Sequence, residues 1–135
     1  MIAYNLFGYA RMHTRGDVIV YKRFAKAVMQ DDSYIVRNTA VKGELPKEVF
    51  ARQTERKKLF RDGEVVFTYY DIKDRRVGAD GSTSSIVADQ VSRVNFPGQE
   101  KLWGAEEIRI RQSALLVREN DAWVMHDFND PAMAP

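Results

Sequence analysis

The sequence predicts an α+β domain in which the helices come first and an antiparallel sheet follows. Apolar residues recur at helical spacing in the first half of the chain, and they alternate at the period of a strand after Asp62-Gly63. The order is therefore helices and then strands, rather than alternating βαβ units. At 135 residues the chain has the length of one domain. We expect a single domain over 1–135, with a helix and turn at 1–16 and a frayed tail at 129–135.

About three helices are expected before the sheet. The first covers the aromatic start of the chain, and the second begins at Asp17, which is a good N-cap. The third begins near Pro46, a residue that suits the first turn of a helix, and runs to about residue 61. Between the second and third helices, 34–42 is rich in β-branched residues, which predicts one short strand or a small hairpin.

Four strands are expected after Gly63. The first, 64–73, alternates with apolar residues on both faces, which is typical of a strand that is covered on both sides. The second spans 84–96 and the third 108–118, where the two faces exchange near Ser113-Ala114 and indicate a bulge or bend. A short acidic turn leads to the last strand, 122–128. Strands of this length, joined in chain order, predict a meander that curls around the helical layer.

Composition excludes several classes of function. The chain has no Cys, which removes disulfides, thiol nucleophiles and thiolate metal sites. It has only two His, at no ligand spacing, so we expect no metal and no cofactor. With 21 basic residues against 19 acidic ones, the chain is too balanced for a typical nucleic-acid binder. No apolar run reaches the ~18 residues of a membrane span, so no integral membrane segment is expected.

Charge is unevenly placed along the chain. Residues 47–61 are basic and 119–135 are acidic. We interpret the basic stretch as the solvated face of a helix, with an anion-binding patch as the alternative. The first twelve residues are apolar and aromatic, but their charges follow the apolar stretch, which is the reverse of a secretory signal. A cytoplasmic protein is therefore expected, or a periplasmic or membrane-tethered one if an upstream segment is missing.

The predicted last hairpin carries a resemblance to a known superfamily. From Ser113 to Phe128 the chain reads SALLVRENDAWVMHDF, which is a strand, an acidic turn and a final strand centred on Trp123. Together with the order of the elements, this ending resembles the nuclear-transport-factor-two-like superfamily, which includes ketosteroid isomerase and polyketide-cyclase-like domains. The resemblance implies a cone-shaped fold, with about three N-terminal helices packed on a curved, mostly antiparallel sheet, and a deep pocket between the two layers. No single subfamily's catalytic set is matched.

Polar residues within the predicted strands are the candidate site residues. In catalytic members of the superfamily, carboxylates, His or Tyr project into an apolar cavity that moves their pKa values toward the working range. The corresponding general-base candidates here are Asp71, Asp89, His126 and Asp127, and the ligand-binding candidates are Tyr69, Tyr70, Arg109 and Trp123. Each group also has a structural interpretation: acids on a solvated face, an arginine in a cross-strand ion pair, and aromatic residues in the wall.

Three functions remain open. The preferred one is non-catalytic binding of a small apolar ligand or a protein partner, because it needs no special pair of residues. We also expect a homodimer through the sheet, because an apolar sheet face that is exposed to water is stabilised when a second copy buries it. The alternative is a cofactor-independent isomerase, dehydratase or cyclase, in which a carboxylate or His removes a proton beside a carbonyl while Tyr69 or Tyr70 stabilises the oxyanion. A second alternative, a cell-envelope assembly domain, comes from the aromatic start of the chain.

Overall fold

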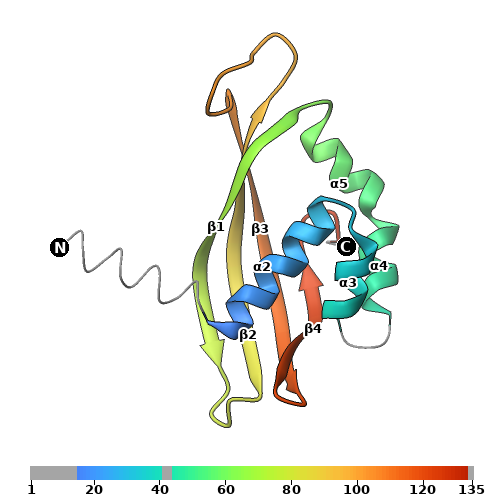
Figure 1. The fold of residues 1–135 in the computed structure, drawn as a ribbon, viewed down its shortest axis with the longest axis vertical. Helices are drawn as coiled ribbons and strands as arrows, with labels where there is room; N and C mark the ends of the chain where they lie inside the picture. The colour runs from blue at the N-terminus through green and yellow to red at the C-terminus, as the bar shows by residue number, and fades with distance from the viewer. Residues whose placement is uncertain (1–14, 41–43, 134–135) are drawn as a thin grey trace, which may run out of the picture.

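A layer of helices lies against one face of a long, curved sheet (Figure 1). The computed structural model describes residues 15–40 and 44–133. In this part of the chain the helices are α2 (Gly16–Met29), α3 (Ser33–Thr39), α4 (Leu45–Ala51) and α5 (Gln53–Phe60). The strands are β1 (Glu64–Val77), β2 (Thr83–Asn95), β3 (Glu106–Glu119) and β4 (Ala122–Asn129). They pair antiparallel in the order β1-β2-β3-β4, which confirms the α+β class and the meander. The helix expected within 1–16 falls mainly on residues 1–14, outside the described part.

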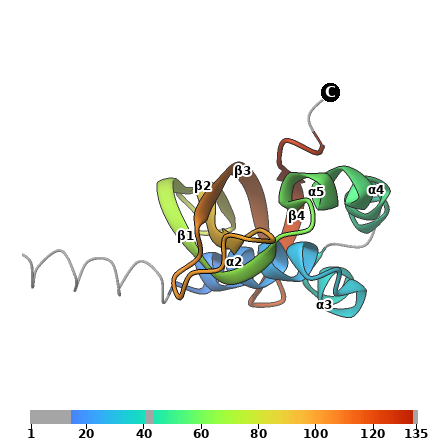
Figure 2. The same cartoon turned by 90° about the horizontal axis from the view of Figure 1, so that it is seen from above.

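The sheet curls around α2, as the view from above shows (Figure 2). We call the face that packs against α2 the concave face and the opposite one the convex face. The buried residues Tyr21, Phe24 and Val28 of α2 pack on the concave face, where the ring of Phe24 lies 5.0 Å from that of Phe128. This contact joins the helical layer to the last strand, so the core lies between α2 and the sheet.

Two bulges on β1 change the face on which its residues lie. The pairing with β2 shifts between Val65 and Phe67 and again between Ile72 and Asp74, and each shift adds one residue to β1. Val65 therefore lies on the concave face, whereas Phe67 and Tyr69 lie on the convex face. Simple alternation puts all three on one face, and that prediction is wrong because the bulge at residue 66 reverses the phase.

The exchange of faces predicted in β3 is also wrong. From Ile110 to Leu116 every second residue of β3 is buried without a break, and Gln112 occupies a concave position between Ile110 and Ala114. The irregularity lies in β4 instead, where Leu115 pairs with Asp127 and Leu116 pairs with Met125. His126 is the extra residue at this bulge, which explains why Met125 and Phe128 are both fully buried.

In the short β element expected at 34–42, residues 34–39 belong to helix α3, Ala40 forms an isolated bridge with Met125, and 41–42 lie outside the described residues. The side chain of Asp32 accepts a hydrogen bond from the backbone N–H of Ile35 at 3.2 Å, which satisfies a free donor at the start of the helix. Val36 is fully buried in the core, so tertiary packing outweighs the β propensity of these residues. The predicted third helix is two helices, α4 and α5, which meet at Arg52.

Helix α2 begins at Gly16, and Asp17 lies in its first turn rather than at the N-cap. The Asp17 carboxylate is buried, and it accepts two hydrogen bonds from Arg75 of β1, at 2.8 and 2.9 Å, and one from Ser84 of β2. Burial alone would raise the pKa of Asp17, but the hydrogen bonds from Arg75 and Ser84 outweigh it and lower the pKa. This acid therefore fixes the start of α2 to the sheet instead of capping the helix.

Candidate functional site

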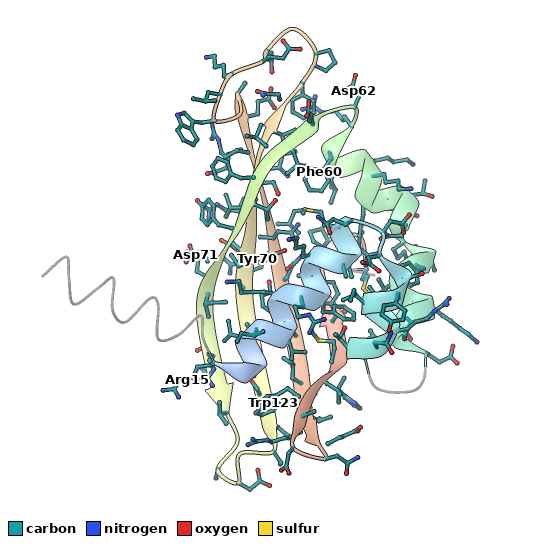
Figure 3. All side chains as sticks on the ribbon, in the orientation of Figure 1. Arg15, Phe60, Asp62, Tyr70, Asp71 and Trp123 are labelled. Carbon is teal, nitrogen blue, oxygen red and sulfur yellow. The ribbon has the colours of Figure 1, made fainter. Side chains whose placement is uncertain are left out.

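A cavity of about 280 Å³ lies between α2, α5 and the concave face of the sheet. That volume is the share of roughly nine water molecules in the liquid, so the cavity holds a ligand of about ten non-hydrogen atoms. Phe60, at the end of α5 beside the sheet (Figure 3), forms part of its wall. The other apolar lining residues are Ala25, Val28, Met29, Leu59, Val65 and Ile110, and the polar ones are Gln53, Arg56, Lys57, Arg61, Gln90, Gln112 and Asp130.

Two glutamines on neighbouring strands form the floor of the cavity. Gln90 of β2 and Gln112 of β3 are each only 3% exposed, and they lie diagonally across the concave face, since Gln90 pairs with Ile110. The hydroxyl of Tyr21 donates to Oε1 of Gln112 at 2.6 Å. The hydroxyl of Tyr70 donates to Oε1 of Gln90 at 3.1 Å. Each tyrosine thus fixes the orientation of one amide.

The amide nitrogens of Gln90 and Gln112 remain available. Neither Nε2 group has an acceptor among the described residues, although no enclosed side-chain nitrogen or oxygen in that part of the chain lacks a partner. Both groups are therefore in contact with the cavity space. A buried N–H donor without an acceptor is costly, so these two groups favour a ligand that supplies one.

The two phenols are donors whose protons are already in use. Burial raises the pKa of Tyr21 well above its usual value, with smaller effects from Tyr70 and Asp89, and burial likewise raises the pKa of Tyr70. Both hydroxyls therefore stay protonated at neutral pH. Their rings meet edge to face, with centroids 5.7 Å apart. Because each hydroxyl has one proton and gives it to a glutamine, Tyr70 supports an amide here rather than an oxyanion.

One wall of the cavity is a buried ion pair between Arg56 of α5 and Asp130, the residue after β4. Nε of Arg56 lies 2.8 Å from Oδ2 of Asp130, and the two side chains are 8% and 4% exposed. Arg56 also donates to Gln53, and Asp130 accepts from the backbone N–H of Met133. Both members of the pair thus have further hydrogen-bond partners within the protein. The pair shapes the cavity wall but leaves no unpaired charge for a ligand. Within the tail 129–135, Asn129 is the last residue of β4 and Asp130 is held by this ion pair.

Comparison with solved structures finds the same architecture in proteins of low sequence identity. Aln2 from a Streptomyces species is 15% identical over 85% of this chain and 86% of its own, with a TM-score of 0.61. A candidate ketosteroid isomerase from Shewanella frigidimarina is 12% identical over 87% and 95%, with a TM-score of 0.51. The intermembrane space region of the chloroplast protein ARC6 is 11% identical over 82% and 90%, with a TM-score of 0.50.

The chain has the nuclear-transport-factor-two-like fold. The resemblance seen in its last hairpin is thereby confirmed at the level of the fold, and no subfamily is indicated. No protein-family model matches the sequence, and comparison with curated proteins finds no match. Because one fold supports many activities, the site has to be argued from its own residues.

Four of the predicted site residues lie on the convex face of this nuclear-transport-factor-two-like fold, away from the cavity. They are Tyr69, Asp71, Asp89 and Arg109. Tyr70 and Asp71 are neighbours in β1 whose side chains point to opposite sides of the strand, Tyr70 toward α2 and Asp71 away from it (Figure 3). The structure thus brings these residues together, but not with the cavity.

The convex residues form a network of ion pairs. The carboxylate of Asp89 is 3% exposed and accepts hydrogen bonds from Arg109, at 3.0 Å, and from Arg111. Asp71 pairs with Lys73 at 2.7 Å and with Arg109 at 3.7 Å. The hydrogen bond from Arg111 lowers the pKa of Asp89; burial opposes this, and a hydrogen bond from Arg109 adds to it. Asp89 is therefore ionised, and Arg109 and Arg111 of the neighbouring strand occupy its carboxylate. This arrangement is a cross-strand ion pair, the structural interpretation given above for the arginine.

The predicted residues of β4 lie outside the cavity lining as well. His126 and Asp127 are exposed, and Asp127 accepts a hydrogen bond from the backbone N–H of Phe128 at 3.0 Å. Trp123 is half-buried against Gly16 at the start of α2, whereas Phe60 lies toward the other end of the sheet (Figure 3). None of the eight predicted residues lines the cavity, and Tyr70 reaches it only through Gln90.

The residues that make the site were not chosen from the sequence. Gln90 and Gln112 are long polar side chains on a strand face that is mainly apolar, with Ala88 and Val94 on β2 and Ile110 and Ala114 on β3, although β2 also places the small polar residues Ser84 and Ser92 there. Such an interruption is the signal that points to them. The Arg56–Asp130 pair joins residues 74 positions apart, and no local pattern indicates it.

The described part of the chain contains no group of three or more His, Asp or Glu side chains placed to hold a metal ion. None of its helices has the length and apolar character needed to cross a membrane.

Proposed function

We propose that the protein is a non-catalytic binding domain whose cavity takes a small, mainly apolar ligand with a hydrogen-bond acceptor. The observation that carries this proposal is the pair of available amide donors, Gln90 and Gln112, on the floor of a cavity whose surface is mainly apolar. Small-molecule sites typically combine apolar walls with a few fixed polar groups that orient the ligand. Here the fixed groups are amides held in place by Tyr21 and Tyr70.

The chemistry of the lining favours binding over catalysis. A general base needs an acceptor within reach of the substrate's proton. Among the described residues that line the cavity, the one carboxylate is Asp130, and Arg56 and the N–H of Met133 already occupy it. The isomerase, dehydratase or cyclase alternative has the fold similarity to the candidate ketosteroid isomerase on its side. Its proposed bases Asp71, Asp89, His126 and Asp127 are not among the lining residues.

The binding proposal is tested by titrating the protein with 4-methylacetophenone, which has an apolar ring and one carbonyl acceptor. Saturable binding is expected, followed by changes in the NMR spectrum of the protein. The double variant Gln90→Met/Tyr70→Phe removes one amide donor together with the hydroxyl that would otherwise be left unpaired. It is expected to bind about fivefold more weakly, since one lost hydrogen bond amounts to about 1 kcal/mol.

The matched control is Tyr70→Phe alone, which keeps the amide of Gln90 but releases its orientation, and which is therefore expected to weaken binding by less than the double variant does. Absence of saturable binding, or equal affinity in the double variant, would contradict the proposal.

We further propose that a second copy of the chain covers the convex face. Phe67 and Tyr69 are stacked side chains on this face, 39% and 40% exposed. Around them lie three acidic residues (Asp71, Asp89, Glu107) and three basic ones (Lys73, Arg109, Arg111), which pair with one another. A face with apolar residues and balanced charges is complementary to itself, as a two-fold interface requires.

Sedimentation velocity at micromolar concentration tests the dimer. The wild type is expected to sediment as a dimer and Tyr69→Arg as a monomer. Tyr34→Arg, which changes an exposed tyrosine on α3, serves as the control and is expected to remain dimeric. A wild-type protein that is monomeric throughout would overturn this proposal and leave the binding proposal in place.

A further inference from the structure

The side chains of the cavity offer donors in excess of acceptors. Gln53 is fully used, because its Nε2 donates to the backbone oxygen of Val28 and to Asp31 while its Oε1 accepts from Arg56. The side-chain oxygens of Gln90 and Gln112 are taken by the tyrosines, and the carboxylate of Asp130 is taken by Arg56. What remains for a ligand is the two amide nitrogens and the cationic side chains of α5 and the residue after it.

The charged residues of the lining also favour a ligand that supplies acceptors, because their net charge is positive. Apart from the closed Arg56–Asp130 pair, the charged lining residues are Lys57 and Arg61, a sum of +2. Their side chains are 71% and 63% exposed, whereas the glutamines are almost fully buried, so the cations lie at the mouth and the amides at the floor.

The cations at the mouth are only weakly engaged. Lys57 lies 3.6 Å from Asp31, and Arg61 lies 3.3 Å from Glu106, and all four side chains are substantially exposed. Exposed single ion pairs of this kind contribute little to stability, so a ligand's anionic group can exchange with them. The guanidinium of Arg61 also lies 4.0 Å from the centroid of the Phe96 ring, a cation–π contact that helps to keep this side chain at the mouth.

We infer that the ligand is a small organic acid with an apolar body, a neutral acceptor at one end and a carboxylate at the other. The body fills the apolar cavity, the neutral acceptor takes the amide donors of Gln90 and Gln112, and the carboxylate stays at the mouth beside Lys57 and Arg61. An ionised carboxylate has acceptors and no donor, so it matches what the cavity offers. It remains at the mouth because a charge that is buried without a counter-charge is costly, and the cations lie at the mouth. This inference rests on the proposed function and specifies its ligand.

The test compares 4-acetylbenzoate with 4-methylacetophenone, which differ only in a carboxylate against a methyl group. At neutral pH and low salt, the protein is expected to bind the acid at least tenfold more tightly. The preference is expected to shrink at about 0.5 M salt, because screening weakens interactions between exposed charges. The double variant Lys57→Gln/Arg61→Gln is expected to lose the preference, because its affinity for 4-acetylbenzoate should fall much more than its affinity for 4-methylacetophenone.

Lys58→Gln is the matched control. Lys58 is an exposed neighbour on α5 that does not line the cavity, so this variant is expected to keep the full preference. If 4-methylacetophenone binds and 4-acetylbenzoate binds no more tightly, the inference is overturned and the binding function stands. A preference that survives in Lys57→Gln/Arg61→Gln also overturns it. If neither compound binds, the proposed function itself fails.

Discussion

Two neighbouring residues of β2, Asp89 and Gln90, show how differently the two faces of this sheet hold a polar group. Both are almost fully buried, at 2% and 3% exposed. Asp89 lies on the convex face, where Arg109 and Arg111 occupy its carboxylate. Gln90 lies on the concave face, where Tyr70 occupies its oxygen and its nitrogen has no described partner. The comparison teaches that burial alone does not mark a site, because an unused hydrogen-bonding group is also needed.

The comparison extends to the ion pairs of the two faces. On the concave side, the side chains of Arg56 and Asp130 are both buried, at 8% and 4% exposed. On the convex side, the carboxylate of Asp89 is buried but its arginine partners are 41% and 61% exposed. Removing one partner should therefore lower the free energy of unfolding more on the concave side than on the convex side. The following predictions rank these losses.

The largest effect is expected from Arg56→Met. This change leaves the carboxylate of Asp130 buried without its cation, and breaking a buried pair in this way typically costs about 3–5 kcal/mol of the free energy of unfolding. Urea denaturation measures the loss. The double variant Arg56→Met/Asp130→Leu is expected to recover most of it, because an apolar pair needs no counter-charge. A loss well below about 1 kcal/mol in Arg56→Met would show that water reaches Asp130.

An intermediate effect is expected from Asp89→Asn, which weakens the charge-assisted hydrogen bonds from Arg109 and Arg111 and costs about 2 kcal/mol at neutral pH. The pKa of Asp89 is lowered in the folded protein from its ordinary 3.8, chiefly by the hydrogen bond from Arg111. The stability from this group is therefore fully present above the ordinary pKa and is lost as pH falls through the lower, folded value.

Urea denaturation of wild type and Asp89→Asn over a series of pH values checks this sign. The difference between the two proteins should be constant above about pH 5 and should shrink on acidification below about pH 4. A difference that does not change with pH would mean that the charge of Asp89 is not the source of its contribution.

The smallest effect is expected from Asp71→Asn. Asp71 is on the same convex face as Asp89, but its side chain is 41% exposed, and so is that of its partner Lys73. Exposed pairs contribute little, so the free energy of unfolding should change by less than about 0.5 kcal/mol in the same urea experiment. A cost equal to that of Asp89→Asn would remove the distinction that we draw between buried and exposed carboxylates on one face.

Most of the fold could be predicted from the sequence because its elements have clear periodicity. The four strands lie within a few residues of their predicted ranges, and α2 follows the apolar stripe at 21–28. Helix α3 could not be predicted from its β-branched residues, because its stability depends on the cap from Asp32 and on burial of Val36 against the core. The latter is a contact between segments distant in the sequence.

The candidate site was harder to predict than the fold because it depends on strand register. A single bulge reverses the faces of all residues beyond it, so counting along β1 places Val65 on the wrong face. The pairing of β2 with β3 places Asp89 opposite Arg111, which turns a candidate base into a paired carboxylate. The glutamines were passed over because they lack acid–base chemistry, although they are the groups that the cavity leaves available.

The contact between Arg56 and Asp130 has a consequence for the order of assembly. Arg56 precedes the whole sheet and Asp130 follows it, so 74 positions of chain separate the two partners. Closing a segment of that length costs chain entropy, which is offset only once the intervening strands have paired. The wall of the cavity is thus completed at the end of folding, after β1 to β4 are in place. Ligand binding therefore requires that the entire sheet has formed.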